Sequence, residues 1–328
     1  MAAAAPFWRH EYFPEYFAEN FTMDIPFAPP GMPQHFDVWE SERCFEWLNR
    51  TVRSWTVEPE EFYTTPDPGR FWAVGRFAGE VLWGKEPGKF RSKFFIRLDA
   101  HEGKIDYIKL WTDPLALLRA AGRDVPVFRM DLYDEKVEEY LEQHPPKTVA
   151  HAKAAGDDDE GLDMSAEAVE KRRRLNLETN FCGIEREKYR SLETVNPDFS
   201  GGVWFIPHEM DEVIPCRTEQ KLDGKDFPPE IAARGNAWTK SSSPWMYRDR
   251  RGELFPTDDE NVYFAEMHGH GPGRWRGNHC DDGHYHQPYL MVLKFDRAGR
   301  MLVRDEVLNP VNKYNCVNIS LPSFPYYH

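Results

Sequence analysis

The residues best suited to acid–base chemistry lie in the last quarter of the chain. Glu306 stands in a run of strand-forming residues, where it shares a face with Arg304 because successive strand side chains point to opposite sides. A carboxyl group in a semi-apolar cavity is desolvated, so that both of its protonation states can be reached near neutral pH. Glu306 is therefore a candidate general acid/base, tuned by Arg304. A surface glutamate that simply pairs with Arg304 would fit the same spacing.

Histidines form a second group of candidates just upstream. His268 and His270 lie two residues apart and so share a strand face with Glu266, and His284 and His286 form a second His-x-His pair. We interpret His268 and His270 as catalytic groups that position the substrate or relay protons beside Glu306. Solvated histidines are the plain alternative. Because two such imidazoles can ligate one ion, a metal enzyme also stays open, although we predict neither a metal ligand nor a cofactor.

Aromatic residues supply candidates for substrate binding. Trp275 and Tyr289 could stack on a planar or cyclic substrate. Most aromatic residues, among them Trp72, Trp111 and Tyr263, are expected to pack in the core. The predicted substrate-binding residues are Glu266, Arg304, His286, Tyr289 and Trp275.

Composition limits the class of protein. The chain has 328 residues, 41% of them hydrophobic, which suits two domains of about 150 residues each. The net charge of −14 argues against nucleic acid and an anionic membrane as partners, because binding phosphates needs a basic face. Its five cysteines are scattered and predict neither a zinc ribbon nor a disulfide framework. We see no secretory signal and no membrane-spanning apolar stretch, and expect a cytoplasmic protein.

The chain carries one pattern twice. Residues 67–84 and 259–271 each form an aromatic-rich strand introduced by an acidic turn. Downstream, Gly103 and Gly299 stand at the same spacing before Leu110 and Glu306, and both strands end in an Asp-Pro or Asn-Pro stop. Two copies of one fold suggest a built-in dimer. The copies differ where chemistry is expected, since the first has leucine where the second has glutamate.

Turn residues and hydrophobic periodicity predict the elements and the domains. An aromatic amphipathic opening, with at most a short helix, covers 7–24. We expect an N-terminal domain over 1–143, a linker over 144–163 and a C-terminal domain over 164–328. Helices followed by meanders of strands indicate an α+β class with mostly antiparallel sheet. The expected helices are 40–55, 114–122, 131–143, 165–183 and 185–193, and the expected strands are 57–64, 70–84, 90–98, 104–112, 202–206, 246–254, 261–270, 285–296 and 300–308.

Several stretches resemble the phenazine-biosynthesis A/B-type proteins of the nuclear transport factor 2-like superfamily. Residues 170–207 resemble that family's opening helices and first strand, 243–271 its central strands, and 303–310 its Arg-Glu-Phe-Met-Asn-Pro strand ending. In the first half, 64–83 and 104–126 resemble the same elements. The resemblance implies two tandem cone-shaped domains, each with helices on a curved sheet around a pocket. The two would form an intramolecular pseudo-dimer, with a further homodimer left open.

The same resemblance implies a reaction. Proteins of this family are understood to join an amine to a ketone, using a pocket glutamate with a histidine beside it. Glu306 matches that glutamate, Leu110 takes its place in the first half, and the helical histidine has no clear counterpart. We therefore expect a cofactor-free enzyme of secondary metabolism that forms Schiff bases from cyclic or aromatic amines and ketones, including Pictet–Spengler-type ring closure. A SnoaL-like aldol cyclase or dehydratase and a non-catalytic small-molecule binding protein are alternatives.

Overall fold

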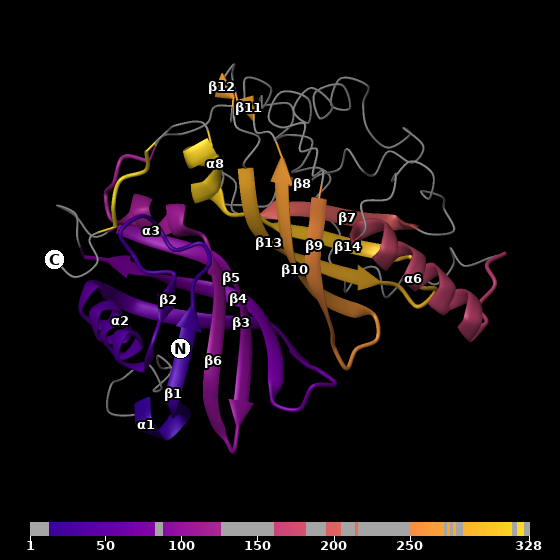
Figure 1. Cartoon of the computed structure of the whole chain (residues 1–328), viewed down its shortest axis with the longest axis horizontal. Helices are drawn as coiled ribbons and strands as arrows, with labels where there is room; N and C mark the ends of the chain where they lie inside the picture. Colours follow the sequence, from indigo (N-terminus) through magenta and orange to yellow (C-terminus); the bar gives the residue numbers. More distant parts are fainter. Residues whose placement is uncertain are drawn as a thin grey trace. The chain divides into compact units, whose positions relative to one another are not determined.

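The computed structural model describes residues 13–82, 88–125, 161–181, 195–204, 214–215, 249–271, 274–275, 278–279, 285–316 and 320–324 (Figure 1). The chain divides into two compact units. Unit 1 contains residues 1–127, 309–315 and 319–328, and unit 2 contains residues 128–308 and 316–318. The predicted helices 131–143 and 185–193, and all of the predicted linker before residue 161, lie outside the described residues.

Unit 1 is built on a six-stranded sheet with the order β2-β1-β6-β5-β4-β3. Neighbouring strands are antiparallel except β1 and β6, which are parallel. Helix α1 is a single turn ahead of β1. The elements are α1 (Phe13–Tyr16), β1 (Phe17–Asp24), β2 (His35–Phe36), α2 (Val38–Thr51), β3 (Val52–Thr64), β4 (Arg70–Val81), β5 (Gly88–His101), β6 (Lys104–Thr112), α3 (Pro114–Ala120) and α8 (Pro310–Cys316).

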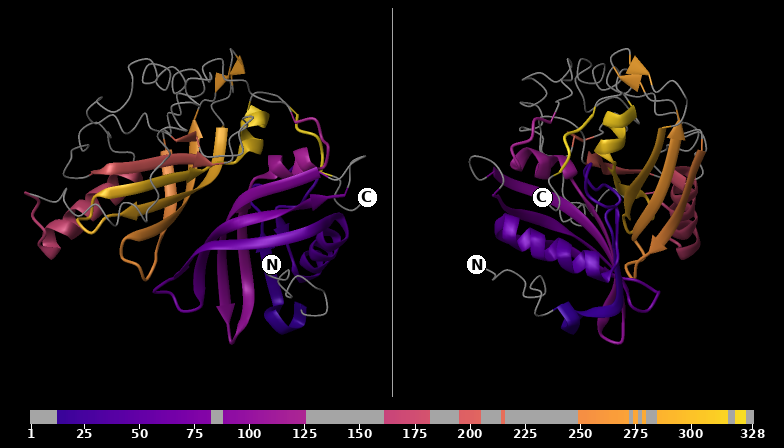
Figure 2. Two further views of the ribbon diagram at one scale, coloured as in Figure 1. Left: turned by 180° about the vertical axis from the view of Figure 1, so that it is seen from behind. Right: turned by 60° about the vertical axis from the view of Figure 1, so that its left-hand side comes forward.

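Unit 2 repeats this order strand for strand, as β8-β7-β14-β13-β10-β9, again with one parallel pair, β14 and β7. Figure 2 shows both sheets as twisted ribbons. Both units are therefore α+β with mostly antiparallel sheets, as predicted. The elements are α6 (Ala166–Phe181), β7 (Val195–Trp204), β8 (Ile214–Pro215), β9 (Asp249–Pro256), β10 (Val262–Gly271), β11 (Arg274–Trp275), β12 (Asn278–His279), β13 (Tyr285–Phe295) and β14 (Met301–Val307).

Helix α2 ends earlier than the sequence predicted. It begins at a capping box, in which the Glu40 amide donates to Asp37 Oδ1 at 2.8 Å and the Asp37 amide donates to Glu40 Oε2 at 3.3 Å. We expected the helix to reach residue 55, but β3 starts at Val52. The helix ends there because of a contact between distant residues: Trp55 stacks on Phe77 of the neighbouring strand, with the ring centroids 5.2 Å apart, and a helix that reached residue 55 would not form this cross-strand pair.

Helices α2 and α3 cover one face of the unit 1 sheet. Leu48 of α2 and Leu117 of α3 pack against a buried cluster that contains Phe77 and Phe94, whose rings stack at 4.2 Å. Burying side chains of this size contributes roughly 1.5–3 kcal/mol each. The apolar contact with these helices fixes which face of the sheet points inward.

Strand β3 closes the free edge of this sheet in an irregular way. Its pairing with β4 shifts register between Arg53 and Thr56 and again between Pro59 and Glu61. Ser54 lies in the left-handed region at φ 55°. Pro59 has no amide hydrogen to offer. The edge is therefore bent twice and lacks one donor.

Polar contacts attach helix α6 to the hairpin turns of unit 2. Arg172 Nε donates to the Ala298 carbonyl at 2.6 Å, and Asn176 Nδ2 donates to the Gly299 carbonyl at 3.4 Å. Gly299 has φ 77°, and a Cβ there would lie 2.3 Å from the Val169 carbonyl oxygen, so the helix can approach only a glycine. Leu177 adds an apolar contact with the sheet. The helix therefore covers the face that carries this contact.

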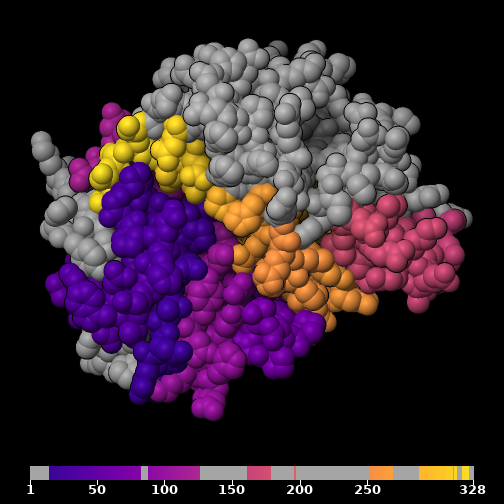
Figure 3. Space-filling view, in the orientation of Figure 1, coloured from indigo at the N-terminus to yellow at the C-terminus, as the bar shows by residue number. Residues whose placement is uncertain are grey.

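The end of the chain belongs to unit 1 rather than to unit 2. Our sequence-based boundary placed residues 309–328 in the C-terminal domain, whereas the structure assigns 309–315 and 319–328 to unit 1. The Phe324 amide donates to the Pro30 carbonyl at 2.7 Å, and the Phe324 ring lies 5.2 Å from that of Trp47. In the space-filling view the tail (yellow) lies beside the N-terminal part of unit 1 (indigo) (Figure 3).

Candidate active site

Strand pairing places Arg304 and Glu306 on the helix-covered face of unit 2. Arg304 lies opposite Leu293, and Glu306 lies opposite Met291. Leu293 and Met291 belong to the buried cluster that packs against Leu177 of α6. The two charged groups therefore project from the sheet on the side where the apolar core and the helix lie.

The two side chains form a largely buried ion pair. An Arg304 Nη donates to Glu306 Oε1, and the side chains are only 6% and 15% exposed. The shared face agrees with the alternation expected from the sequence. Apolar neighbours lower the local dielectric and strengthen the attraction between the charges, while desolvation opposes it.

Two tyrosines share this face. Tyr289 is 1% exposed and lies in the same buried cluster. Tyr263 pairs with Leu293, which places it in the same cross-strand row as Arg304. Burial raises the pKa of Tyr263, so that its hydroxyl remains protonated at neutral pH. From the sequence, Tyr263 was expected to be a core residue. Its spacing predicts that it shares a strand face with Ala265 and Met267, but only the strand pairing shows that Glu306 lies on the same face.

The predicted histidine partner lies on the opposite face. Glu266 pairs with Leu290, and Leu290 pairs with Val307, the residue after Glu306. Glu266 and His268 therefore point away from the Glu306 face, and His268 is exposed. The expectation that His268 lies beside Glu306 is wrong. A strand pattern shows which residues share a face, but not which face meets that of another strand.

The side chains of several other predicted site residues lie outside the described residues. The backbone of His270 pairs with that of His286, but both side chains and that of Trp275 lie outside the described residues. Among the side chains that are described, no group of three or more His, Cys, Asp and Glu is placed to hold a metal ion. The metal-enzyme alternative rests on the undescribed histidines and stays untested.

Unit 1 has apolar residues at the matching positions. Leu110 pairs with Ile96, as Glu306 pairs with Met291. Ile108 stands two residues before Leu110, as Arg304 does before Glu306, and it is 4% exposed. Leu110, like Leu117, packs against the buried cluster of unit 1. The helix-covered face of unit 1 therefore lacks the ion pair at these two positions.

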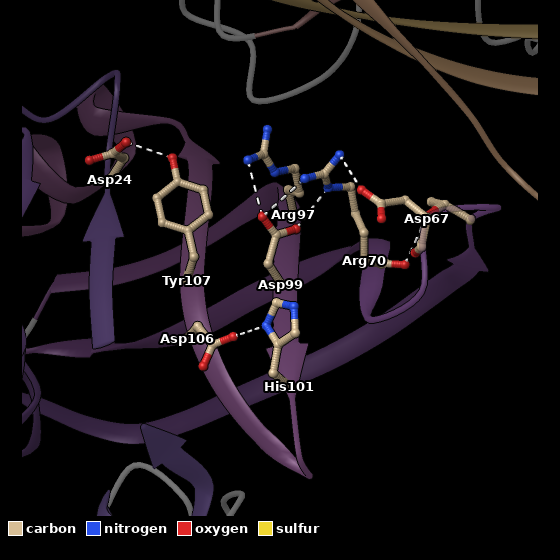
Figure 4. A network of polar contacts seen from close by, with 9 residues as sticks. Asp24, Asp67, Arg70, Arg97, Asp99, His101, Asp106 and Tyr107 are labelled. Atoms are coloured by element: carbon tan, nitrogen blue, oxygen red, sulfur yellow. Dashed lines mark hydrogen bonds and ion pairs between the residues drawn. The ribbon is translucent and has the colours of Figure 1, made fainter. Parts of the chain in front are cut away.

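A polar network that the sequence analysis missed crosses the other face of the unit 1 sheet (Figure 4). Arg70 Nε and Arg97 Nη2 donate to the two oxygens of Asp99, at 2.9 and 3.2 Å. The Tyr107 hydroxyl donates to Asp24 Oδ2 at 2.6 Å, and the Arg97 guanidinium lies 5.0 Å from the Tyr107 ring. Polar residues at alternate strand positions, such as Arg97 and Asp99, could have indicated part of this network from the sequence. The remaining partners, Arg70 and Tyr107, lie on other strands. The charges satisfy one another, which favours a structural role.

Comparisons with known proteins give distant likenesses only. No protein-family model matches the chain, and no curated protein matches it. A phenazine biosynthesis-related protein from Pseudomonas aeruginosa is a similar solved structure, 20% identical, with a TM-score of 0.34 over 41% of this chain and 87% of that one. Others are an NTF2-like protein from Burkholderia xenovorans (22%, TM-score 0.29, 34% and 82%) and a SnoaL-like polyketide cyclase candidate from Jannaschia sp. (14%, TM-score 0.29, 34% and 77%). Likenesses with TM-scores this low carry no argument about the reaction, which has to be inferred from the residues of this chain.

None of the described helices is both long enough and apolar enough to cross a bilayer.

Proposed function

We propose that unit 2 is a cofactor-free acid/base enzyme that condenses an amine with a ketone or aldehyde. The observation that supports this is the Glu306 carboxylate, which is largely buried on the helix-covered face and held by Arg304. A carboxylate in apolar surroundings is also a good partner for an ammonium ion, the form in which an alkylamine substrate arrives at neutral pH.

The first step uses Glu306 as a base. As the carboxylate, Glu306 takes one proton from the substrate ammonium and frees the nitrogen lone pair. That nitrogen attacks the carbonyl carbon, a C–N bond forms, and the carbonyl oxygen receives the proton back from Glu306. The carboxylate then removes a proton from the new N–H group to give a neutral carbinolamine.

The second step uses Glu306 as an acid. The proton it has just accepted passes to the carbinolamine hydroxyl, the C–O bond breaks, and water leaves as the nitrogen lone pair forms the iminium. One ammonium and one carbonyl compound give one iminium and one water, and Glu306 ends as the carboxylate. A carbon nucleophile within the same substrate could then close a nitrogen ring on the iminium carbon, with loss of a proton to Glu306.

The apolar surroundings support this cycle. Met291 opposite Glu306 and the fully buried Tyr289 on the same face exclude water, which would hydrolyse an iminium. Tyr263 on this face is a hydrogen-bond donor at neutral pH, as a protonated tyrosine is. We assign it as a candidate donor to a substrate oxygen. Tyr263→Phe should then raise KM for the carbonyl substrate more than it lowers kcat; an unchanged KM would exclude this role.

We also propose that the two units pack as an intramolecular pseudo-dimer, with unit 1 as a structural partner. In each unit one sheet face packs against helices, and the other carries large apolar side chains, in unit 1 beside the polar network around Asp99. In unit 1, Trp72 and Trp111 stack there at 5.6 Å. Apolar faces of this kind normally have a partner, and a tethered sister unit is present at high effective concentration. Trp72→Asp should increase the radius of gyration in small-angle scattering; an unchanged radius would contradict this packing.

A non-catalytic binding protein is the second candidate, and the closed ion pair favours it, because Arg304 could serve only to neutralise Glu306. Substitution of Glu306 by Gln separates the two. An enzyme should lose about 10²-fold or more in turnover, whereas a carrier should still bind its ligand. An aldol cyclase would differ from both by turning over substrates that lack an amine.

The test uses a panel of cyclic and aromatic primary amines mixed with ketones and aldehydes at neutral pH. Mass spectrometry would detect products lighter than the reactant sum by one water. The matched control is Leu110→Gln, which places the same amide at the equivalent position of unit 1. We expect Glu306→Gln to abolish product and Leu110→Gln to leave turnover nearly unchanged in correctly folded protein. Equal turnover in wild type and Glu306→Gln would refute the assignment.

A further inference from the structure

The strand that carries Glu306 runs directly into a segment of unit 1. Strand β14 ends at Val307, and after Leu308 the chain enters the part of unit 1 that begins at Asn309. We call residues 309–315 and 320–324 the C-terminal tail. Only Val307 and Leu308 separate Glu306 from Asn309, the first residue of the tail, so order in the tail restrains the end of β14 through the main chain.

Asn309 makes two contacts at the start of the tail. Its Oδ1 accepts a hydrogen bond from the Val311 amide at 3.0 Å and so caps α8. Its Nδ2 donates to the Pro26 carbonyl of unit 1 at 3.4 Å, and the residue is 2% exposed. In the first copy, Asp113 caps α3 by accepting from the Leu115 amide at 2.9 Å. A carboxylate can only accept, so the amide of Asn309 supplies a link that aspartate could not.

The rest of the tail is also built into unit 1. Tyr314 is fully buried, and Arg119 and Asp113 of unit 1 lie close enough to affect its ionisation. At the far end, Phe324 bonds to Pro30 through its amide and contacts Trp47 through its ring. Gly31 has φ 90°, and a Cβ there would lie 2.9 Å from the Phe324 carbonyl oxygen. The loop before α2 is therefore shaped around the tail.

We propose that the C-terminal tail fixes the end of β14 and that Asn309 is a positioning residue for Glu306. The catalytic consequence rests on the proposed function, but the structural one does not. Acid/base groups must be held within about 0.5 Å of their productive geometry. A strand whose last residues are anchored has fewer backbone conformations than one that ends freely. Docking of the tail on unit 1 therefore restricts Glu306 in the neighbouring unit through the main chain.

The experiment compares Asn309→Asp with its mirror image, Asp113→Asn, in the full-length protein. Asn309→Asp keeps the helix cap and nearly the same volume but removes the donor to Pro26. Hydrogen exchange measured by mass spectrometry should show amides of residues 301–307 exchanging about tenfold faster, one factor of ten corresponding to about 1.4 kcal/mol of local opening. Asp113→Asn should leave that segment unchanged. Where turnover is measurable, kcat should fall several-fold with little change in KM.

The outcomes separate this inference from the proposed function. Wild-type exchange at residues 301–307 in folded Asn309→Asp would overturn the positioning role. Faster exchange without turnover on any amine and carbonyl pair would support the tail and count against the condensation reaction. If Asn309→Asp fails to fold, Phe324→Ala serves instead, because it loosens the far end of the tail and leaves Asn309 in place. Unchanged exchange at 301–307 in Phe324→Ala would then overturn the proposal.

Discussion

Units 1 and 2 share a strand order but place different residues at equivalent positions of their sheets. On the helix-covered face, unit 2 has Arg304 and Glu306 where unit 1 has Ile108 and Leu110. On the other face, Arg97 and Tyr107 in unit 1 match Val292 and Val303 in unit 2 by strand pairing, although unit 2 also carries Glu266 and Lys294 on that face. One backbone thus supports either a charged or an apolar interior. The difference shows that the ion pair of unit 2 is not required by the fold.

Energetics support the same conclusion. A buried ion pair seldom stabilises a protein more than well-packed apolar residues of similar volume do, because both charges lose their hydration. Unit 1 shows that this backbone accepts an Ile and Leu pair at the two positions. Stability alone therefore does not explain the ion pair.

The largest effect is expected when the ion pair of unit 2 is replaced by the residues that unit 1 has at the matching positions, Ile and Leu. Glu306→Leu alone leaves the buried Arg304 without its carboxylate, and we expect it to lower the free energy of unfolding by about 3–5 kcal/mol. The double variant Arg304→Ile with Glu306→Leu should recover most of that loss, because no unpaired charge remains. Urea denaturation of both variants measures the effect. A double variant as unstable as the single one would show that unit 2 depends on the pair for folding.

The hairpin turns before β6 and β14 offer a second comparison. Asp296 accepts from the Arg300 guanidinium at 2.7 Å and from Asn196 at 2.6 Å, and its side chain is only 11% exposed. In unit 1 the turn carries Asp106 with His101, whose side chain is 71% exposed. We expect Asp296→Ala to lower the unfolding free energy by about 3 kcal/mol, since it leaves a buried arginine unpaired. Thermal unfolding of Asp106→Ala should match wild type; comparable losses in both would contradict this account.

The smallest expected effect concerns pH. The hydrogen bond to Asp106 raises the pKa of His101 above its ordinary value of 6.5. The pair therefore stabilises the fold fully below pH 6.5, and this contribution disappears as the pH rises through the raised folded-state value. Because His101 is solvent-exposed, only its own titration should report the effect clearly. Proton NMR should show that Asp106→Asn moves the His101 midpoint down toward 6.5; an unmoved midpoint would assign the shift to other charges.

Much of the fold could be predicted because strand patterns are local. Residues 104–112 were predicted as a strand and form β6 with those bounds, and the strand predicted over 300–308 forms β14 from Met301 to Val307. The aromatic opening was harder. Strand β1 lies parallel to β6, which is distant in sequence, and without that partner the residues after Pro14 fit a helix as well. Likewise Trp55 fits a helical pattern until its stacking on Phe77 is known.

The candidate site was predictable only within one strand. Alternation gave the shared face of Arg304 and Glu306, because both belong to β14. It could not place His268 relative to Glu306, since the two belong to different strands whose registers depend on the whole sheet. The same limit explains why most of the network around Asp99 was missed: Arg97 lies on the same strand as Asp99, but Arg70 and Tyr107 lie on other strands. Its charges become partners only through tertiary pairing.

The irregular edge formed by β3 bears on how the protein behaves in a crowded solution. A long, regular outer strand would act as a template on which another polypeptide could extend the sheet, the first event in many aggregation pathways. Two register shifts and the missing amide hydrogen of Pro59 interrupt that template. Straightening it, for example by Pro59→Thr, would remove a safeguard against self-association without touching any residue of the candidate site.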